Sequence, residues 1–283
     1  MAGASRLSRL LAHLVLILGA AVMLLPVYVA FVASTHDGGD FLSGRVGLLP
    51  GPHFVENYRL ALSTGSSTAG IPPVAPMLWN SLVVAMGIAV GKIAISLLSA
   101  FAVCYFRFPF RVAAFWLIFL TLMLPVEVRI LPTFEVTARL GLLNSYAGLT
   151  VPLIASATAT FLFRQVFMTI PDELTEAALV DGAGPLTFFR TILLPLSRTN
   201  IAALFVILFL YGWNQYLWPL VVTTDTAHYT VVMGIRRLVG AAGEADPVWH
   251  LVMATAILAL LPPVLVIAAM QRLFVRGLTE TEK

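Results

Sequence analysis

Six long apolar stretches constrain this chain more than any other feature of its sequence. They cover residues 10–33, 78–105, 112–131, 146–167, 200–222 and 250–274. About 20 apolar residues in a helix cross the roughly 30 Å hydrocarbon core of a bilayer, and each stretch reaches that length. A chain of 283 residues with 59% hydrophobic and 11% charged residues is also too apolar for a soluble domain. The sequence therefore predicts an all-α integral membrane protein with six transmembrane helices, forming a single domain over residues 1–283.

The first stretch follows Arg6 and Arg9, as the apolar part of a signal peptide follows basic residues. It is longer than the core of a signal peptide, and residues 31–33, Phe-Val-Ala, lack the small-x-small pattern of a cleavage site. We therefore expect an uncleaved first transmembrane helix. Within the third stretch, Pro125 removes a backbone donor, so we expect a kink there.

The distribution of basic residues predicts the orientation. Six crossings put both chain ends on one side, together with the second and fourth loops. That side holds ten basic residues, which are Arg6, Arg9, Arg107, Arg111, Arg164, Arg190, Arg198, Arg272, Arg276 and Lys283. The other loops hold six, which are Arg45, Arg59, Arg129, Arg139, Arg236 and Arg237. Because cytoplasmic loops carry the excess of arginine and lysine, we expect both termini and the loop of residues 168–199 to be cytoplasmic.

The loop of residues 168–199 contains a short helix suited to contact a partner. Pro171-Asp172-Glu173 is typical of a first helical turn, with proline at the first position and acids at the positive end of the helix dipole. Gly182 can adopt the left-handed conformation that ends a helix. The candidate contact residues combine small and acidic side chains, and they are Glu173, Glu176, Ala177, Ala178, Asp181 and Gly182. An ordinary solvated helix between two transmembrane helices is the alternative.

The spacing of this loop resembles a known motif. Glu176-Ala177-Ala178, three residues, Gly182, nine residues and then Ile192-Leu193-Leu194-Pro195 is similar to the EAA motif of the membrane subunits of bacterial ABC importers. In that family the motif forms a coupling helix that docks in a cleft of a cytoplasmic ATPase. The resemblance implies that Glu176, Ala177, Ala178 and Gly182 contact an ATPase, through a coupling helix between transmembrane helices 4 and 5. Glu173 and Asp181 join them as candidates because of their charge.

Three places in the sequence are candidates for the substrate pathway. Lys92 lies near the middle of the second stretch, where a charge costs about 2.5–3.5 kcal/mol and must face a partner, a cavity or the pathway. Arg129, two residues after Glu127, can hold two phosphate oxygens at once. Trp213, Asn214 and Gln215 can line a pathway and bind hydroxyl groups. A structural lysine, a pair of surface charges and an interfacial aromatic belt are the respective alternatives.

Longer stretches narrow the resemblance. The Trp213-Asn214-x-x-Leu217-Trp218-Pro219 sequence, six spans and the EAA loop resemble the carbohydrate-type ABC permeases, the group that contains the maltose permease. Within this group, residues 122–130, 156–165, 211–220 and 270–278 are most similar to the second permease subunits of glycerol-3-phosphate and glycerophosphodiester importers. The resemblance covers nearly the whole chain, except the loop of residues 224–246.

The resemblance implies a heterotetrameric importer in the bacterial cytoplasmic (inner) membrane. Its partners would be a second homologous permease, two copies of an ATPase and an extracytoplasmic solute-binding protein, with no nucleic acid. The sequence contains no Gly-x-x-x-x-Gly-Lys-Ser/Thr loop, so we expect a non-enzymatic transport subunit without cofactor or metal, with ATP and Mg²⁺ bound by the ATPase. A sugar (trehalose- or maltose-type) permease is one alternative. A six-span channel or membrane assembly protein is another.

Overall fold

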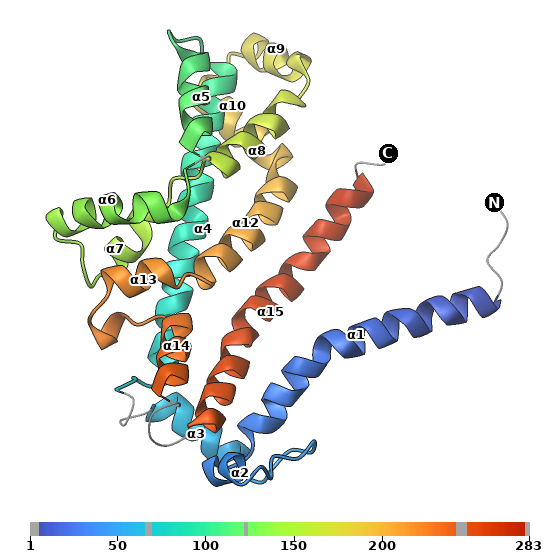
Figure 1. Cartoon of the computed structure of the whole chain (residues 1–283). Helices are drawn as coiled ribbons and strands as arrows, with labels where there is room; N and C mark the ends of the chain where they lie inside the picture. The colour runs from blue at the N-terminus through green and yellow to red at the C-terminus, as the bar shows by residue number, and fades with distance from the viewer. Residues whose placement is uncertain (1–5, 66–69, 122–123, 242–247, 281–283) are drawn as a thin grey trace. The chain divides into compact units, whose positions relative to one another are not determined.

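A computed structural model describes residues 6–65, 70–121, 124–241 and 248–280 (Figure 1). The regular elements in these ranges are all helices, which confirms the predicted all-α class. Three helices are long and apolar enough to cross a bilayer, and the number rises to five if two bent helix pairs each count as one crossing. The three are α1 (Arg6–Ser34), α4 (Val74–Tyr105) and α15 (Trp249–Glu280). They coincide with the first, second and sixth predicted stretches.

The chain forms two compact units. Unit 1 comprises residues 1–76 and 234–261, and unit 2 comprises residues 77–233 and 262–283. The boundaries fall inside the helices α4, α14 (Val231–Ala241) and α15. The single domain over residues 1–283 stays a prediction.

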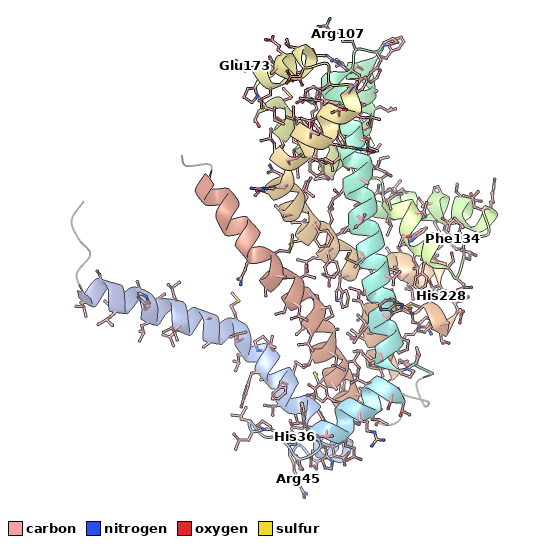
Figure 2. The ribbon with its side chains drawn as sticks, turned by 180° about the vertical axis from the view of Figure 1, so that it is seen from behind. His36, Arg45, Arg107, Phe134, Glu173 and His228 are labelled. Atoms are coloured by element: carbon pink, nitrogen blue, oxygen red, sulfur yellow. The ribbon has the colours of Figure 1, made fainter. Side chains whose placement is uncertain are left out.

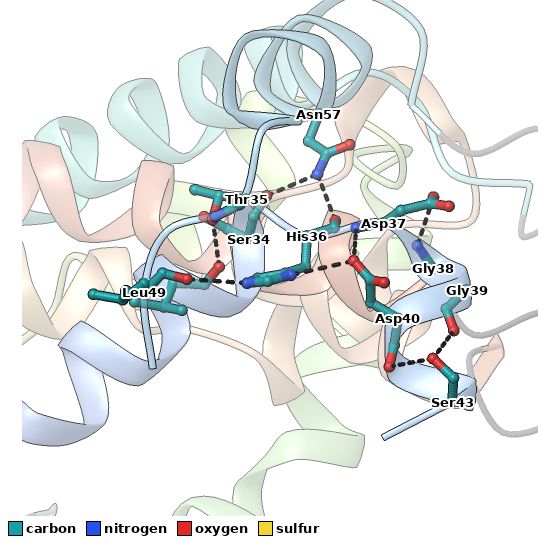
Figure 3. Close-up of polar contacts among 12 residues, drawn as sticks. Ser34, Thr35, His36, Asp37, Gly38, Gly39, Asp40, Ser43, Leu49 and Asn57 are labelled. Carbon is teal, nitrogen blue, oxygen red and sulfur yellow. Dashed lines mark hydrogen bonds and ion pairs between the residues drawn. The ribbon is translucent and has the colours of Figure 1, made fainter. Parts of the chain in front are cut away.

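Unit 1 contains α1 and two shorter helices, α2 (Gly38–Leu42) and α3 (Phe54–Ser63), and a polar cluster fixes the chain where it leaves α1 (Figure 3). The side-chain amide of Asn57 donates to the carbonyl oxygens of Ser34 (2.9 Å) and His36 (2.8 Å). The His36 ring lies 3.2 Å from the Asp40 carboxylate through Nδ1 and 3.1 Å from the Leu49 carbonyl through Nε2. The hydrogen bond to His36 holds the pKa of Asp40 below its ordinary value. The loop after the first transmembrane helix is therefore an ordered polar structure.

Unit 2 is built around α4, and its other elements follow in chain order. They are α5 (Arg111–Leu120), α6 (Val126–Arg139), α7 (Tyr146–Thr150), α8 (Ala157–Met168), α9 (Asp172–Val180), α10 (Pro185–Phe188), a π-helical turn (Phe189–Leu193), α11 (Leu194–Leu196), α12 (Arg198–Trp213) and α13 (Leu217–Val222). The helix α14 (Val231–Ala241) begins in unit 2. Arg107 and Glu173 lie at the same end of unit 2 (Figure 2).

The third predicted helix, residues 112–131, is wrong as a continuous element. The helix α5 ends at Leu120 and spans about 15 Å, roughly half of the hydrocarbon core. Pro125 is the N-cap of α6, which runs across the direction of α4 (Figure 1). Because proline cannot donate to the preceding turn, a new helix starts here, and the predicted kink is a complete break. Most of the chain between the third and fourth apolar stretches is helical as well, because α6 continues to Arg139.

The fourth and fifth predicted helices are also interrupted. Helical segments Tyr146–Leu153 and Ala157–Met168 are bent by 50° relative to each other, and the Ser156 hydroxyl caps the second one by accepting from the Ala159 amide. In the fifth stretch, α12 ends at Trp213 and α13 restarts at Leu217. Pro219 fits the first turn of α13, where a missing N–H disturbs no bond. A serine cap therefore starts the second helix of the fourth stretch, whereas the fifth stretch breaks between Trp213 and Leu217 without a side-chain cap at the start of α13.

The core of unit 2 joins α4 to α7 and α12. Val84, Ile88 and Leu149 are fully buried, and Tyr211 packs against them. Gly212 brings α12 so close to α4 that an added Cβ would lie 2.9 Å from Ala85 Cα. Small residues at such crossings let membrane helices approach closely. The part of α12 that carries Tyr211 is therefore held rigidly against α4.

Candidate coupling surface and transport pathway

The predicted partner-binding helix is α9. Its two ends have the residues expected from the sequence, except that the first helical residue comes one position later than expected. Pro171 is the N-cap rather than the first helical residue, and Asp172 and Glu173 occupy the first turn. At the other end Gly182 has a φ of 72°, which confirms the predicted left-handed conformation. The Gly182 amide donates to Leu179 O (3.0 Å) and the Ala183 amide donates to Ala178 O (2.8 Å). These two bonds form a Schellman motif that ends the helix sharply.

The candidate contact residues on α9 are exposed with one exception. Glu173, Glu176, Ala177, Asp181 and Gly182 are exposed, whereas Ala178 is 6% exposed and packs into unit 2. Ala178 therefore seats the helix in this structure instead of offering surface to a partner. The contact of the other five with an ATPase stays a prediction.

Sequence reasoning missed the apolar part of this surface. Leu179 is 69% exposed, Val180 is 88% exposed and Leu186 is also exposed, so apolar side chains adjoin the acidic ones. These residues follow the Glu-Ala-Ala sequence in the same loop, and this position was the signal in the sequence that could have identified them. Exposed apolar groups rimmed by charge mark interaction sites in many proteins. In the following text, coupling surface means Glu173, Glu176, Asp181, Leu179, Val180 and Leu186.

Aromatic rings anchor the coupling surface to α4. The ring of Phe189 lies 4.9 Å from that of Phe101, and the ring of Phe188 lies 5.2 Å from that of Tyr105, measured between centroids. Leu193, in the second half of the motif, is fully buried. These packed rings hold the segment that follows α9 against α4.

Replacing Gly182 with alanine is expected to weaken uptake, because the left-handed conformation costs about 1–2 kcal/mol in an L-residue. The control is Gly184→Ala, in the same loop. Neither glycine has an atom within 4 Å of an added Cβ, but Gly184 has a φ of −69°. We expect Gly184→Ala to transport normally and Gly182→Asn to recover part of the loss, measured as initial uptake rates. Equal rates for the two alanine variants would contradict this prediction.

The pathway candidates Lys92 and Arg129 meet at two adjoining cavities in unit 2. The larger has a volume of about 650 Å³ and is lined by Lys92, Ile95, Ser99, Ile118, Thr121, Leu124, Pro125, Arg129, Ala155, Ser156, Ala157, Thr158, Thr160 and Tyr211. The smaller is also lined by Lys92, Arg129, Ala155 and Tyr211, and it adds Thr133 and Gln215. Lys92 and Arg129 are the charged residues among the described ones that line the two cavities, and both are cations. This arrangement suits an anion.

The described contacts of Lys92 are unusual for a lysine. Lys92 is 7% exposed, and its Nζ lies 3.8 Å from the centroid of the Tyr211 ring. The described ion pairs of unit 2 join Arg139 to Glu135 and His228 to Asp225 and do not involve Lys92. The side chain of Glu127 lies outside the described part of the chain. An aromatic face is therefore the contact that the structure gives to this buried cation.

The three polar and aromatic candidates on α12 are placed differently from one another. Gln215 lines the smaller cavity, and its amide donates to the Tyr211 carbonyl (3.1 Å). Asn214 is exposed and caps α12 by donating to the Leu210 carbonyl (2.9 Å). Trp213 is buried in the packing of α12 beside Phe209. The structure therefore brings Gln215, but neither of its neighbours, to the lining with Lys92. Tyr211, the other cavity residue of this stretch, was not singled out from the sequence.

Broken apolar helices, a solvent-facing loop helix and a cation-lined cavity define the membrane subunit of a transporter. The chain belongs to the family of binding-protein-dependent transport system inner membrane components, which matches residues 92–280. It is 59% identical over 276 residues to the sn-glycerol-3-phosphate transport system permease protein UgpE of Brucella melitensis, covering 98% of each chain. It is 58% identical over 271 residues to the protein of the same name from Salmonella typhi, covering 96% of each. The resemblance found in the sequence is thereby confirmed.

A solved structure supports the fold. The chain is similar, with a TM-score of 0.78 and 21% identity, to a bacterial ABC transporter involved in the import of the acidic polysaccharide alginate. The similarity covers 96% of this chain and 99% of the other. The breaks inside the predicted helices thus belong to a fold that a solved transporter chain shares.

Proposed function

We propose that this chain is a permease subunit of an ATP-driven importer for glycerol 3-phosphate and glycerophosphodiesters. The observation that carries the proposal is identity of nearly 60% over the full length of several permeases named for sn-glycerol-3-phosphate. The cation-lined cavities agree with it, because arginine and lysine bind phosphate oxygens. A neutral sugar would not need the two cations that line these cavities.

The proposed complex has the chain and a second homologous permease in the bacterial inner membrane, with two ATPase copies on the cytoplasmic side. An extracytoplasmic binding protein delivers the substrate. This chain binds neither cofactor nor metal in the proposal, and the ATPases bind ATP and Mg²⁺. In the proposal the chain crosses the membrane six times, and both termini and the loop that holds α9 lie in the cytoplasm, in agreement with the excess of basic residues on that side.

In the proposed mechanism, the coupling surface docks on the ATPase through its acids and its apolar side chains. Closure of the ATPase pair moves α9, and the packed rings of Phe188 and Phe189 pass the displacement to α4. Because Lys92 is part of α4, the same movement changes access to the cavities. The chain's own role is thus to convert a cytoplasmic movement into alternating access.

The decisive experiment measures ATP hydrolysis by the assembled transporter in nanodiscs with its binding protein. The compounds tested are glycerol 3-phosphate, glycerophosphocholine, trehalose and maltose. Stimulation by the two glycerophosphate compounds, and not by the sugars, is expected. Stimulation by a sugar alone would retain the importer and overturn the substrate. Failure to assemble with an ATPase would overturn the importer and favour a channel or an assembly protein.

A further inference from the structure

Among the described residues, the contact of the buried Lys92 is an aromatic face rather than a carboxylate. Lys92 lies 18 residues from the start of α4 and 13 from its end, so it stands near the middle of a helix that crosses the bilayer. A charged side chain at this depth requires a partner, and in most proteins the partner is a carboxylate. The described residues around it provide the face of Tyr211 instead. An ammonium that contacts an aromatic ring still has N–H groups that can donate hydrogen bonds to a ligand.

Tyr211 is well suited to hold the ammonium in a fixed place. Its ring packs against Val84, Ile88 and Leu149, its carbonyl accepts from Gln215, and the close approach at Gly212 fixes the backbone beside it. The ring therefore cannot follow Lys92 if the ammonium moves. Lys92 and Tyr211 line both cavities, so the pair stands where the two adjoin.

We propose that Tyr211 is the resting partner of Lys92 and that the phosphate of the substrate displaces the ammonium from the ring. The inference rests on the proposed function, and it names the residue that makes phosphate binding reversible. A phosphate oxygen offers a charge-assisted hydrogen bond, which is stronger than the contact with the ring. When the substrate leaves, the ring takes the ammonium back, so the empty site is never left with an unpartnered buried cation. Tyr211 acts through Lys92 and is a positioning residue.

The proposed exchange predicts an effect of Tyr211 variants on substrate affinity that a tyrosine with only a structural role would not produce. Removing the ring takes a competitor away from the phosphate, so Tyr211→Leu is expected to bind glycerol 3-phosphate more tightly and to transport it more slowly. The expected gain in affinity is roughly 2- to 30-fold, the factor equivalent to one cation–π contact. Tyr211→Phe retains the ring face and is expected to resemble the unaltered protein. A tyrosine needed only for packing would give weaker binding or none when replaced by leucine.

The test is equilibrium binding of radiolabelled glycerol 3-phosphate to the nanodisc complex without binding protein or ATP, at concentrations up to millimolar. The same variants are made in a Lys92→Gln background, where the difference between Tyr211→Leu and Tyr211→Phe is expected to disappear. Unchanged or weaker binding by Tyr211→Leu, a difference that survives Lys92→Gln, or no binding by any variant would each overturn the inference. Stimulation of ATP hydrolysis by glycerol 3-phosphate in the unaltered complex tests the proposed function separately.

Discussion

Replacing Glu176 with lysine is expected to abolish uptake and to leave the membrane helices folded. Glu176 is exposed on α9, beside the apolar side chains of Leu179 and Val180. A partner that fits an acidic helix must offer positive charge, and a like charge placed at such an interface costs several kcal/mol. The spans do not depend on Glu176, because the helix is seated by Ala178 and by the rings after it. Uptake, the amount of protein in the membrane and co-purification of the ATPase are the measurements.

Two further variants separate charge from general damage. Glu176→Gln removes the charge without reversing it and is expected to retain part of the uptake. Glu135→Lys reverses an exposed acid on α6 whose ion pair with Arg139 spans 3.7 Å at the surface. Such exposed pairs contribute less than about 1 kcal/mol, so normal uptake is expected. Normal uptake by Glu176→Lys in a well-expressed protein would refute the role of the coupling surface.

Replacing Gly148 with alanine is expected to prevent accumulation of folded permease or to lower its melting temperature strongly. An added Cβ would collide with the Leu142 carbonyl oxygen and would lie 3.3 Å from Val222. The backbone of Gly148 is also bonded at both ends, to the Ser145 hydroxyl (3.0 Å) and to the indole N–H of Trp218 (3.0 Å). Overpacking a core costs about 1–3 kcal/mol, and more where backbone must move. Melting of the detergent-purified protein measures the effect.

The control for this substitution is Gly240→Ala, in the helix α14. An added Cβ at Gly240 meets no atom within 4 Å, and alanine favours a helix by about 1 kcal/mol over glycine. Its melting temperature is therefore expected to stay the same or to rise. If Gly148→Ala melts at as high a temperature as Gly240→Ala, the close contact between Gly148 and the Leu142 carbonyl does not limit stability.

Part of the fold follows from local sequence and part does not. Hydrophobicity alone located α1, α4 and α15, because an uninterrupted apolar stretch has one low-energy form in a bilayer. It failed for the third, fourth and fifth stretches, where apolar composition continues across a break. Pro125 was interpreted as a kink within one helix, but it starts α6. Whether a proline bends a helix or ends it depends on what packs behind it, and local pattern carries no such information.

The candidate site shows the same division. The ends of α9 were predictable because caps are local, and Gly182 adopts the expected conformation. Lys92 and Arg129 were each predicted as separate pathway candidates, because a charge within or beside a transmembrane helix needs a partner or a polar space, but that they line the same cavities emerged only from the structure. The contact between Lys92 and Tyr211 was not predictable, because the two residues are far apart in the chain and meet only through the packing of α12 on α4. Ala178, expected at the partner interface, is buried for the same reason.

The cationic lining of the cavities has a consequence for energy conversion. In the described linings the charged side chains, Lys92 and Arg129, are cations that suit an anionic substrate. A phosphate monoester carries a charge of about −1.5 to −2 at neutral pH. Each negative charge moved toward a negative cytoplasm costs about 2.3 kcal/mol per 100 mV. In the proposed importer, ATP-driven closure by the partner ATPases would therefore supply the energy that gives the flux of the phosphate ester its inward direction.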